Sequence, residues 1–312
     1  MADTPSIPVL DMREDACAFA PQLGDSFRRF GFAMVRGHGL DPELVATGWR
    51  LSRDLFALPE EEKARFILPG SGGARGYTPF GTERAKGAAT HDLKEFWHIG
   101  REETPGEALA RPAMPANIWP ERPERFRPVF SRLFAQMERI GAVLLSRIAM
   151  DLGLEPDWFD GPTKRGNSVL RLLHYPPVAG DAGGGERAGP HEDINLITLL
   201  LGAEEAGLEL LDTNGRWLPV SPPDGALVVN IGDMLQRLTN HVLPSTTHRV
   251  RNPEGVAAAR SRYAMPFFMH LRGDYPIRTL TRCISPANPD RYPEAILADD
   301  YLRERLGDIG LL

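Results

Sequence analysis

The sequence predicts an α+β protein in which a helical N-terminal half packs against a β-rich core of the jelly-roll or barrel kind. From Ser168 onward the chain consists of short apolar segments, which Gly, Pro, Asn and Asp separate at intervals of about 8–12 residues, as in jelly rolls and barrels. Before that point the longest apolar pattern, between Arg122 and Leu154, has helical spacing. Residues 287–312 return to a helical pattern.

The N-terminal half alternates short strands with helices. We expect a strand at 7–10, a helix at 15–30, a buried strand at 32–35, a helix at 41–65 and a Gly- and Thr-rich loop or hairpin at 70–90. The helix at 41–65 has Asp41 in the N-cap position and Pro42 at its first position, where the missing N–H of proline costs nothing.

The β-rich part is the middle one of three regions, which we expect to fold together as one unit. Its strands are expected at 169–175, 194–201, 208–211, 217–220, 226–231, 234–238, 247–250 and 262–270. The regions are an N-terminal helical region with short strands at 1–165, a jelly-roll core at 166–286 and a C-terminal helical segment at 287–312.

Composition argues against several classes of protein. A net charge of −6 and a pI near 5.8 provide no basic field for nucleic acid. No apolar run approaches the roughly 18 residues of a membrane span, and the first residues do not resemble a signal peptide. The two cysteines, Cys17 and Cys283, cannot form a disulfide framework or a cysteine zinc site. We therefore expect a cytoplasmic protein, and no feature indicates an oligomeric state.

The segment His191-Glu192-Asp193 is the strongest candidate for a metal site. We expect it to open a strand, which would place His191 and Asp193 on one face, because successive side chains of a strand point to opposite faces. Two histidines and one carboxylate form the facial triad that holds Fe(II) and leaves positions open for oxygen and substrates. The second histidine is expected from a neighbouring strand, and spacing alone leaves His248 and His241 as alternatives.

Several longer motifs resemble one known family, in its order and near its spacing. They are IPVLDM at 7–12, RRFGFAMVRGHGL at 28–40, RLLHYPP at 171–177, HEDINLITLL at 191–200, the stretch from Gly207 to Asn240, STTHRV at 245–250 and RYAMPFFMH at 262–270. Over nearly its whole length the chain resembles the isopenicillin N synthase-like branch of the iron(II)/2-oxoglutarate-dependent oxygenases. The resemblance implies a double-stranded β-helix (jelly-roll) core, with His191, Asp193 and His248 as the iron ligands.

The resemblance also implies a site for 2-oxoglutarate. The family uses an Arg-x-Ser element and a tyrosine to hold the far carboxylate of this keto-acid, and Arg262 and Tyr175 match them. Arginine suits the role because its planar fork pairs with a carboxylate through two parallel hydrogen bonds. Ala264 stands where the family has the serine. Arg260 and Arg249 are alternative cations.

The function implied is that of an Fe(II)/2-oxoglutarate-dependent dioxygenase that oxidises a small molecule, with hydroxylation as the expected outcome. Its cofactors would be Fe(II), 2-oxoglutarate and O2, with ascorbate as a further reductant. Three alternatives stay open. They are a related Fe(II) oxidase that does not use 2-oxoglutarate, a zinc hydrolase and a non-catalytic jelly-roll binding protein.

Substrate contacts are expected from the segment before the core. In the family a segment with similar Arg and Tyr residues covers the mouth of the barrel, which makes Arg75 a candidate partner for an anionic group of the substrate. Tyr77 and Trp97, the latter in the motif DLKEFW at 92–97, are candidates for apolar walls. This implies a carboxylate-bearing substrate. In the simpler alternative, Arg75 bonds turn carbonyls and Trp97 belongs to the core.

Overall fold

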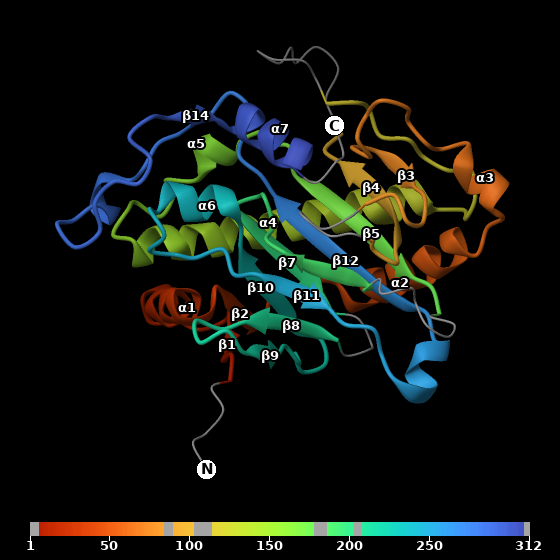
Figure 1. Ribbon diagram of the computed structural model, residues 1–312, viewed down its shortest axis with the longest axis horizontal. Helices are drawn as coiled ribbons and strands as arrows, with labels where there is room; N and C mark the ends of the chain where they lie inside the picture. The colour runs from red at the N-terminus through yellow and green to blue at the C-terminus, as the bar shows by residue number, and fades with distance from the viewer. Residues whose placement is uncertain (1–5, 84–89, 103–113, 178–185, 203–206, 309–312) are drawn as a thin grey trace.

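A large sheet carries helices on one face and a smaller sheet on the other (Figure 1). The computed structural model describes residues 6–83, 90–102, 114–177, 186–202 and 207–308. The α-helices are α1 (Ala16–Phe30), α2 (Pro42–Phe56), α3 (Glu60–Ala64), α4 (Phe126–Asp151), α5 (Asp160–Thr163), α6 (Asp233–Leu238) and α7 (Ala298–Asp308), with 3-10 helices at Gly255–Ala259 and Thr281–Cys283. None of these described helices has the length and apolarity needed to cross a bilayer.

Eight strands form the large sheet, in the order β1-β2-β10-β7-β12-β5-β4-β3. They are β1 (Val9–Asp11), β2 (Phe32–Arg36), β10 (Leu227–Ile231), β7 (Ile197–Leu201), β12 (Arg262–Met269), β5 (Val169–Tyr175), β4 (Glu95–Gly100) and β3 (Gly76–Thr78). Strands of the first half of the chain therefore occupy both edges of this sheet. The sequence patterns did not predict β4.

The small sheet has four strands, and a two-stranded ribbon lies outside both sheets. The small sheet runs in the order β6 (Ala188–His191), β11 (His248–Val250), β8 (Leu208–Leu211) and β9 (Trp217–Pro219). The ribbon pairs β13 (Pro276–Ile277) with β14 (Ile296–Leu297).

Three expected elements differ from the structure. The helix expected at 41–65 is two helices, α2 and α3, because Pro59 cannot continue a helix and instead precedes α3. The segment 234–238 is helix α6 and not a strand, since a short apolar run has no periodicity that separates the two. In the C-terminal segment α7 begins only at Ala298, and three prolines stand before it, at 286, 289 and 293.

Alternation along the strands gives the large sheet two different faces. Leu170 and Leu172 of β5 join Met265 and Phe267 of β12 in the main core, which packs against α1, α2 and α4. Their neighbours point the other way, and Leu173 and other inward residues form a second apolar cluster with residues of the small sheet. The space between the two sheets is where the functional side chains gather.

A buried ion pair ties α3 to β4 on the helix-covered face. The Lys63 ammonium lies 2.7 Å from Glu95 Oε2, and both side chains are almost fully buried. Glu95 also accepts hydrogen bonds from Tyr77 Oη and His174 Nδ1. Burial alone would raise the pKa of Glu95, but the bonds from His174, Lys63 and Tyr77 hold it below its ordinary value.

We expect Lys63→Met to destabilise the fold by about 3–5 kcal/mol, because it leaves the Glu95 carboxylate buried without its cation. The control is Arg50→Met, which removes an exposed ion pair with Asp54 and should cost less than about 1 kcal/mol. Urea unfolding of the two variants measures both values, and equal losses would contradict the prediction.

Candidate metal centre

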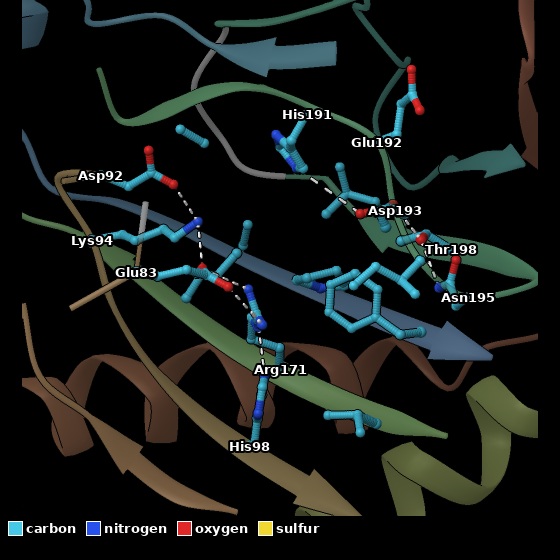
Figure 2. Close-up of a pocket in the computed structure, with 18 of the residues that line it drawn as sticks. Glu83, Asp92, Lys94, His98, Arg171, His191, Glu192, Asp193, Asn195 and Thr198 are labelled. Carbon is cyan, nitrogen blue, oxygen red and sulfur yellow. Dashed lines mark hydrogen bonds and ion pairs between the residues drawn. The ribbon is translucent and has the colours of Figure 1, made fainter. Parts of the chain in front are cut away.

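A cavity of about 260 Å³ lies between the two sheets (Figure 2). The large sheet lines it with the inward residues of β5 and β12, and the small sheet lines it with residues of β6 and β11. His191, Asp193 and His248 face this cavity, as do Arg262 and Tyr175. The structure therefore brings both groups of predicted site residues to one place.

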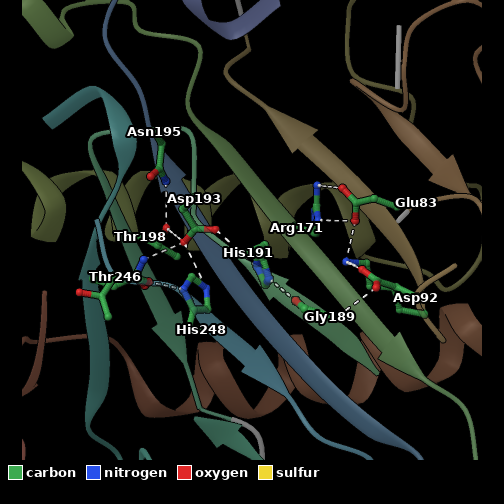
Figure 3. A network of polar contacts seen from close by, with 12 residues as sticks. Glu83, Asp92, Arg171, Gly189, His191, Asp193, Asn195, Thr198, Thr246 and His248 are labelled. Carbon is green, nitrogen blue, oxygen red and sulfur yellow. Dashed lines mark hydrogen bonds and ion pairs between the residues drawn. The ribbon is translucent and has the colours of Figure 1, made fainter. Parts of the chain in front are cut away.

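Three potential metal ligands converge at one side of the cavity (Figure 3). One ligand atom from each of His191, Asp193 and His248 lies within 4.8 Å of the others. His191 Nε2 is 4.0 Å from Asp193 Oδ1, and His248 Nε2 is 3.9 Å from Asp193 Oδ2. The two histidines are direct partners in the pairing of β6 with β11.

The local structure at His191 differs from the sequence expectation. His191 ends β6 instead of opening a strand, and Asp193 lies in the loop that precedes β7. The two residues thus do not share the face of one strand. They converge because the loop turns the Asp193 carboxylate back toward β11, where His248 lies.

Backbone carbonyls orient both imidazoles. His191 Nδ1 lies 2.8 Å from the carbonyl oxygen of Gly189, and His248 Nδ1 lies 3.0 Å from that of Thr246. A carbonyl oxygen only accepts, so each Nδ1 carries the proton and each Nε2 presents its lone pair to the centre. Burial and the neighbouring His248 lower the pKa of His191 to about 4, which favours the neutral form that binds metals.

The Asp193 carboxylate is held from the large sheet. Its Oδ2 accepts hydrogen bonds from Thr198 Oγ1 at 2.5 Å and from Asn230 Nδ2 at 2.8 Å. Burial would raise the pKa of Asp193, but the two histidines and these bonds keep it below its ordinary value. Two oriented imidazoles and an ionised carboxylate beside a cavity fit a divalent iron ion.

Arg262 and Tyr175 lie side by side in the cavity wall. They are partners in the pairing of β12 with β5, both are buried, and the guanidinium carbon is 5.2 Å from the centre of the phenol ring. Ala264 also faces the cavity, directly opposite Leu173. The alternative cations lie elsewhere. Arg249 pairs with Glu209 and stacks on Trp217, and Arg260 is exposed.

Arg75 bonds a turn carbonyl, as the simpler alternative expected, and it also lines the cavity. Its guanidinium donates to the carbonyl oxygen of Ala74 at 2.6 Å and to Asn167 Oδ1 at 3.4 Å. It is 2% exposed. A buried cation therefore reaches the cavity from the Gly-rich segment before β3.

Tyr77 and Trp97 do not line the cavity, so the expectation that they form its apolar walls is wrong. Both side chains point to the helix-covered face of the sheet and belong to the main core. Tyr77 Oη donates to Glu95, and Trp97 packs against the rings of Phe66 and Phe126. The simpler alternative, in which Trp97 belongs to the core, describes the structure.

His241 stays outside the metal centre. It lies in the turn after α6 with a positive φ of 65°, and its Nε2 is 2.6 Å from Tyr292 Oη. His248 is thus the second histidine of the cluster, as the family resemblance implied.

The sequence patterns missed a charged cluster in the cavity wall, which Figure 2 shows. Lys94 lies 2.7 Å from Glu83 and 2.8 Å from Asp92, and Arg171 lies 3.2 Å from Glu83. Arg171 also donates to His98 Nε2 at 2.5 Å. Of these residues, only Arg171 could have been expected in the cavity wall from the sequence. It precedes Tyr175 by four residues and therefore lies on the same face of the strand.

His270 is a second missed residue. It lines the cavity, is 8% exposed, and its Nδ1 has no hydrogen-bond partner among the described residues. Burial lowers the pKa of His270 to about 4, so the imidazole is neutral at pH 7. The sequence could have indicated His270, because it follows Arg262 and Ala264 at even spacing and an extended strand would place all three on one face.

Comparisons with known proteins agree with this arrangement. A family model described as the N-terminal region of the non-haem dioxygenase in morphine synthesis matches residues 7–122, and the model of the 2OG-Fe(II) oxygenase superfamily matches residues 166–271. The proline hydroxylase buaE of Petromyces alliaceus is 31% identical over 303 residues, which cover 93% of this chain and 92% of that protein.

Solved structures are similar over nearly the whole chain. A 2OG-Fe(II) oxygenase family protein from Caulobacter crescentus is 50% identical, with a TM-score of 0.90 over 98% of this chain and 100% of that one. A protein from Neurospora crassa, solved in complex with alpha-KG and thymine, is 27% identical, with a TM-score of 0.86 over 98% of each chain. The resemblance seen in the motifs is thus confirmed, and this chain belongs to the 2OG-Fe(II) oxygenase superfamily.

Proposed function

We propose that this enzyme uses Fe(II), 2-oxoglutarate and O2 to hydroxylate a small molecule that carries a carboxylate. The observation that carries the proposal is a single cavity that holds the His191, Asp193 and His248 cluster together with the buried pair of Arg262 and Tyr175. The overall reaction converts a substrate C–H bond, O2 and 2-oxoglutarate into C–OH, succinate and CO2.

Each protein group has a separate task. The two Nε2 atoms and Asp193 Oδ1 would hold the metal, since hydrogen bonds already occupy both Nδ1 atoms and Asp193 Oδ2. Bound Fe(II) supplies the redox chemistry that activates O2 as the keto-acid loses CO2. Arg262 and the Tyr175 phenol would bind the far carboxylate of 2-oxoglutarate through charge-assisted bonds.

Apolar residues complete the keto-acid site. Leu173, Ala264, Leu208 and Val250 line the cavity and belong to the apolar cluster between the sheets. They exclude water from the region between the metal centre and Arg262, which strengthens every charge interaction inside it. Ala264 supplies no hydroxyl, so the far carboxylate would depend on Arg262 and Tyr175.

The packing of the two sheets supports a jelly-roll core. The large and the small sheet enclose one apolar cluster and one cavity, with the two histidines on the small sheet and the keto-acid anchor on the large one. We infer that these sheets are the two halves of a double-stranded β-helix, the core that the resemblance to the iron(II)/2-oxoglutarate-dependent oxygenases implies.

Substrate recognition is assigned to Arg75. It is the residue expected to meet an anionic group, and it reaches the cavity as a buried cation. Because a buried guanidinium binds a carboxylate strongly, this position favours a small carboxylic acid such as an amino acid.

The function is tested by following the products. With Fe(II), 2-oxoglutarate and O2, small carboxylic acids are screened for stimulated succinate formation, and chelation of the metal should abolish it. An enzyme that consumes O2 with its own substrate but ignores 2-oxoglutarate would overturn the proposal.

Removing any metal ligand should abolish turnover. His191→Ala, Asp193→Ala and His248→Ala are each expected to lose iron-dependent succinate formation while staying folded by circular dichroism, because two protein ligands hold the metal weakly. His241→Ala is the control and should keep its activity. An active His248→Ala beside an inactive His241→Ala would contradict the assignment.

Arg262→Leu should raise the KM for 2-oxoglutarate sharply, since an unpaired buried carboxylate costs about 2–5 kcal/mol. Arg249→Leu, which changes a cation outside the cavity wall, is the matched control and should leave this KM unchanged. Ala264→Ser should be tolerated and tighten keto-acid binding. Equal effects of Arg262→Leu and Arg249→Leu on the KM would argue against the anchor.

Arg75→Ala should raise the KM for the substrate found by the screen and leave the KM for 2-oxoglutarate unchanged, because the far carboxylate of 2-oxoglutarate is assigned to Arg262. The melting temperature is measured in parallel, since Arg75 also bonds the Ala74 carbonyl. Equal rises in both KM values, or a loss of stability alone, would restrict Arg75 to its role in the turn.

A further inference from the structure

The strand that carries His191 lies at the edge of the small sheet, and the segment before β4 covers that edge. β6 is outermost in the order β6-β11-β8-β9. On its open side the Leu93 N–H donates to the carbonyl oxygen of Glu186 at 3.0 Å, and the Gly189 N–H donates to Asp92 Oδ1 at 3.1 Å. Asp92 and Leu93, the first two residues of the motif at 92–97, thus join the large sheet to this edge.

Gly189 connects Asp92 to the metal centre. Its N–H is bound by Asp92, and its carbonyl oxygen accepts the proton of His191 Nδ1 at 2.8 Å (Figure 3). The N–H and the carbonyl of Gly189 belong to adjacent peptide groups that meet at its Cα. The bond to Asp92 therefore restrains the position of the carbonyl that sets the plane of the His191 ring.

Asp92 is itself held firmly. Its Oδ2 lies 2.8 Å from the Lys94 ammonium, which also contacts Glu83, and Glu83 is bound by Arg171 of β5. Burial alone would lower the pKa of Lys94, but the Glu83 and Asp92 carboxylates raise it above its ordinary value, so the ammonium stays charged. The anchor of Asp92 is therefore the large sheet.

Of the three ligands, His191 most needs such support. Its side chain is 33% exposed, against 8% for Asp193 and 9% for His248. Asp193 is held by two side chains of the large sheet, and His248 lies on an inner strand. His191 ends an edge strand, where backbone pairing holds it from one side only.

We propose that Asp92 is a positioning residue for the metal centre, which acts through Gly189 to hold the His191 imidazole in the orientation that binds iron. The inference rests on the proposed iron site. Partners that orient metal-bound histidines typically change metal affinity by about 10–100-fold when they are removed, and Asp92 acts one group further out, so we expect about tenfold.

The test measures Mn(II) binding to the metal-free protein by calorimetry, without turnover. Asp92→Ala should raise the Kd about tenfold. Asp92→Asn should largely restore affinity, because its amide oxygen still accepts the Gly189 N–H. Lys63→Met is the matched control, since it breaks a buried ion pair on the other face of the sheet and should lower stability without changing the Kd.

A double-mutant cycle separates positioning from a general loss of structure. If Asp92 acts through His191, then adding Asp92→Ala to His191→Ala should not weaken the residual Mn(II) affinity further. An unchanged Kd in folded Asp92→Ala, or an undiminished loss in the His191→Ala background, would overturn the proposal. If Asp92→Ala does not fold, Asp92→Ser is measured in its place, because its side chain is shorter than that of aspartate. The same results would then support or overturn the proposal.

Different results would reject the proposed function and this inference. If His191→Ala, Asp193→Ala and His248→Ala all bind Mn(II) as the unchanged protein does, the metal site itself is wrong. If those variants bind Mn(II) more weakly while Asp92→Ala retains full affinity, the iron site stands and the role of Asp92 is rejected.

Discussion

The alternation of side chains along β5 and β12 is the constraint on which the rest of the structure depends. Every second residue faces the helices and builds the main core, and the residues between them face the small sheet. Arg171, Leu173 and Tyr175 therefore share one wall with Arg262 and Ala264. A shift of one residue in either strand would exchange the core for the cavity wall, so the packing of α4 and the geometry of the site are fixed together.

Burying many charges around one cavity requires each to be compensated. Lys94 lies between Glu83 and Asp92, and Arg171 spreads over Glu83, His98 and the ring of Phe96. Such a cluster is costly when one member is lost, but while complete it makes the wall rigid. The cluster thus presents a set of mutually held polar groups to the cavity.

How much of the site could be predicted depends on how far apart in the sequence the contacting residues lie. His191, Asp193, His248 and Arg262 stand in short motifs whose neighbours identify them, and the structure brings them together. The contacts of Arg171 with His98 and Glu83 span 73 and 88 residues, which no local pattern relates. The fold followed the same rule. Helices α1 and α4 were predicted from their own periodicity, whereas β4 takes its place from its pairing with β5.

The proposed metal ligands are divided between the two sheets in a way that would couple metal binding to folding. His191 and His248 come from the small sheet. Asp193 is held by Thr198 of β7 and Asn230 of β10, which both belong to the large sheet. A metal ion bound by all three ligands therefore closes a link between the sheets across the cavity. Because a ligand that binds only the folded state stabilises it, iron should contribute to the packing of the two sheets as well as to the chemistry.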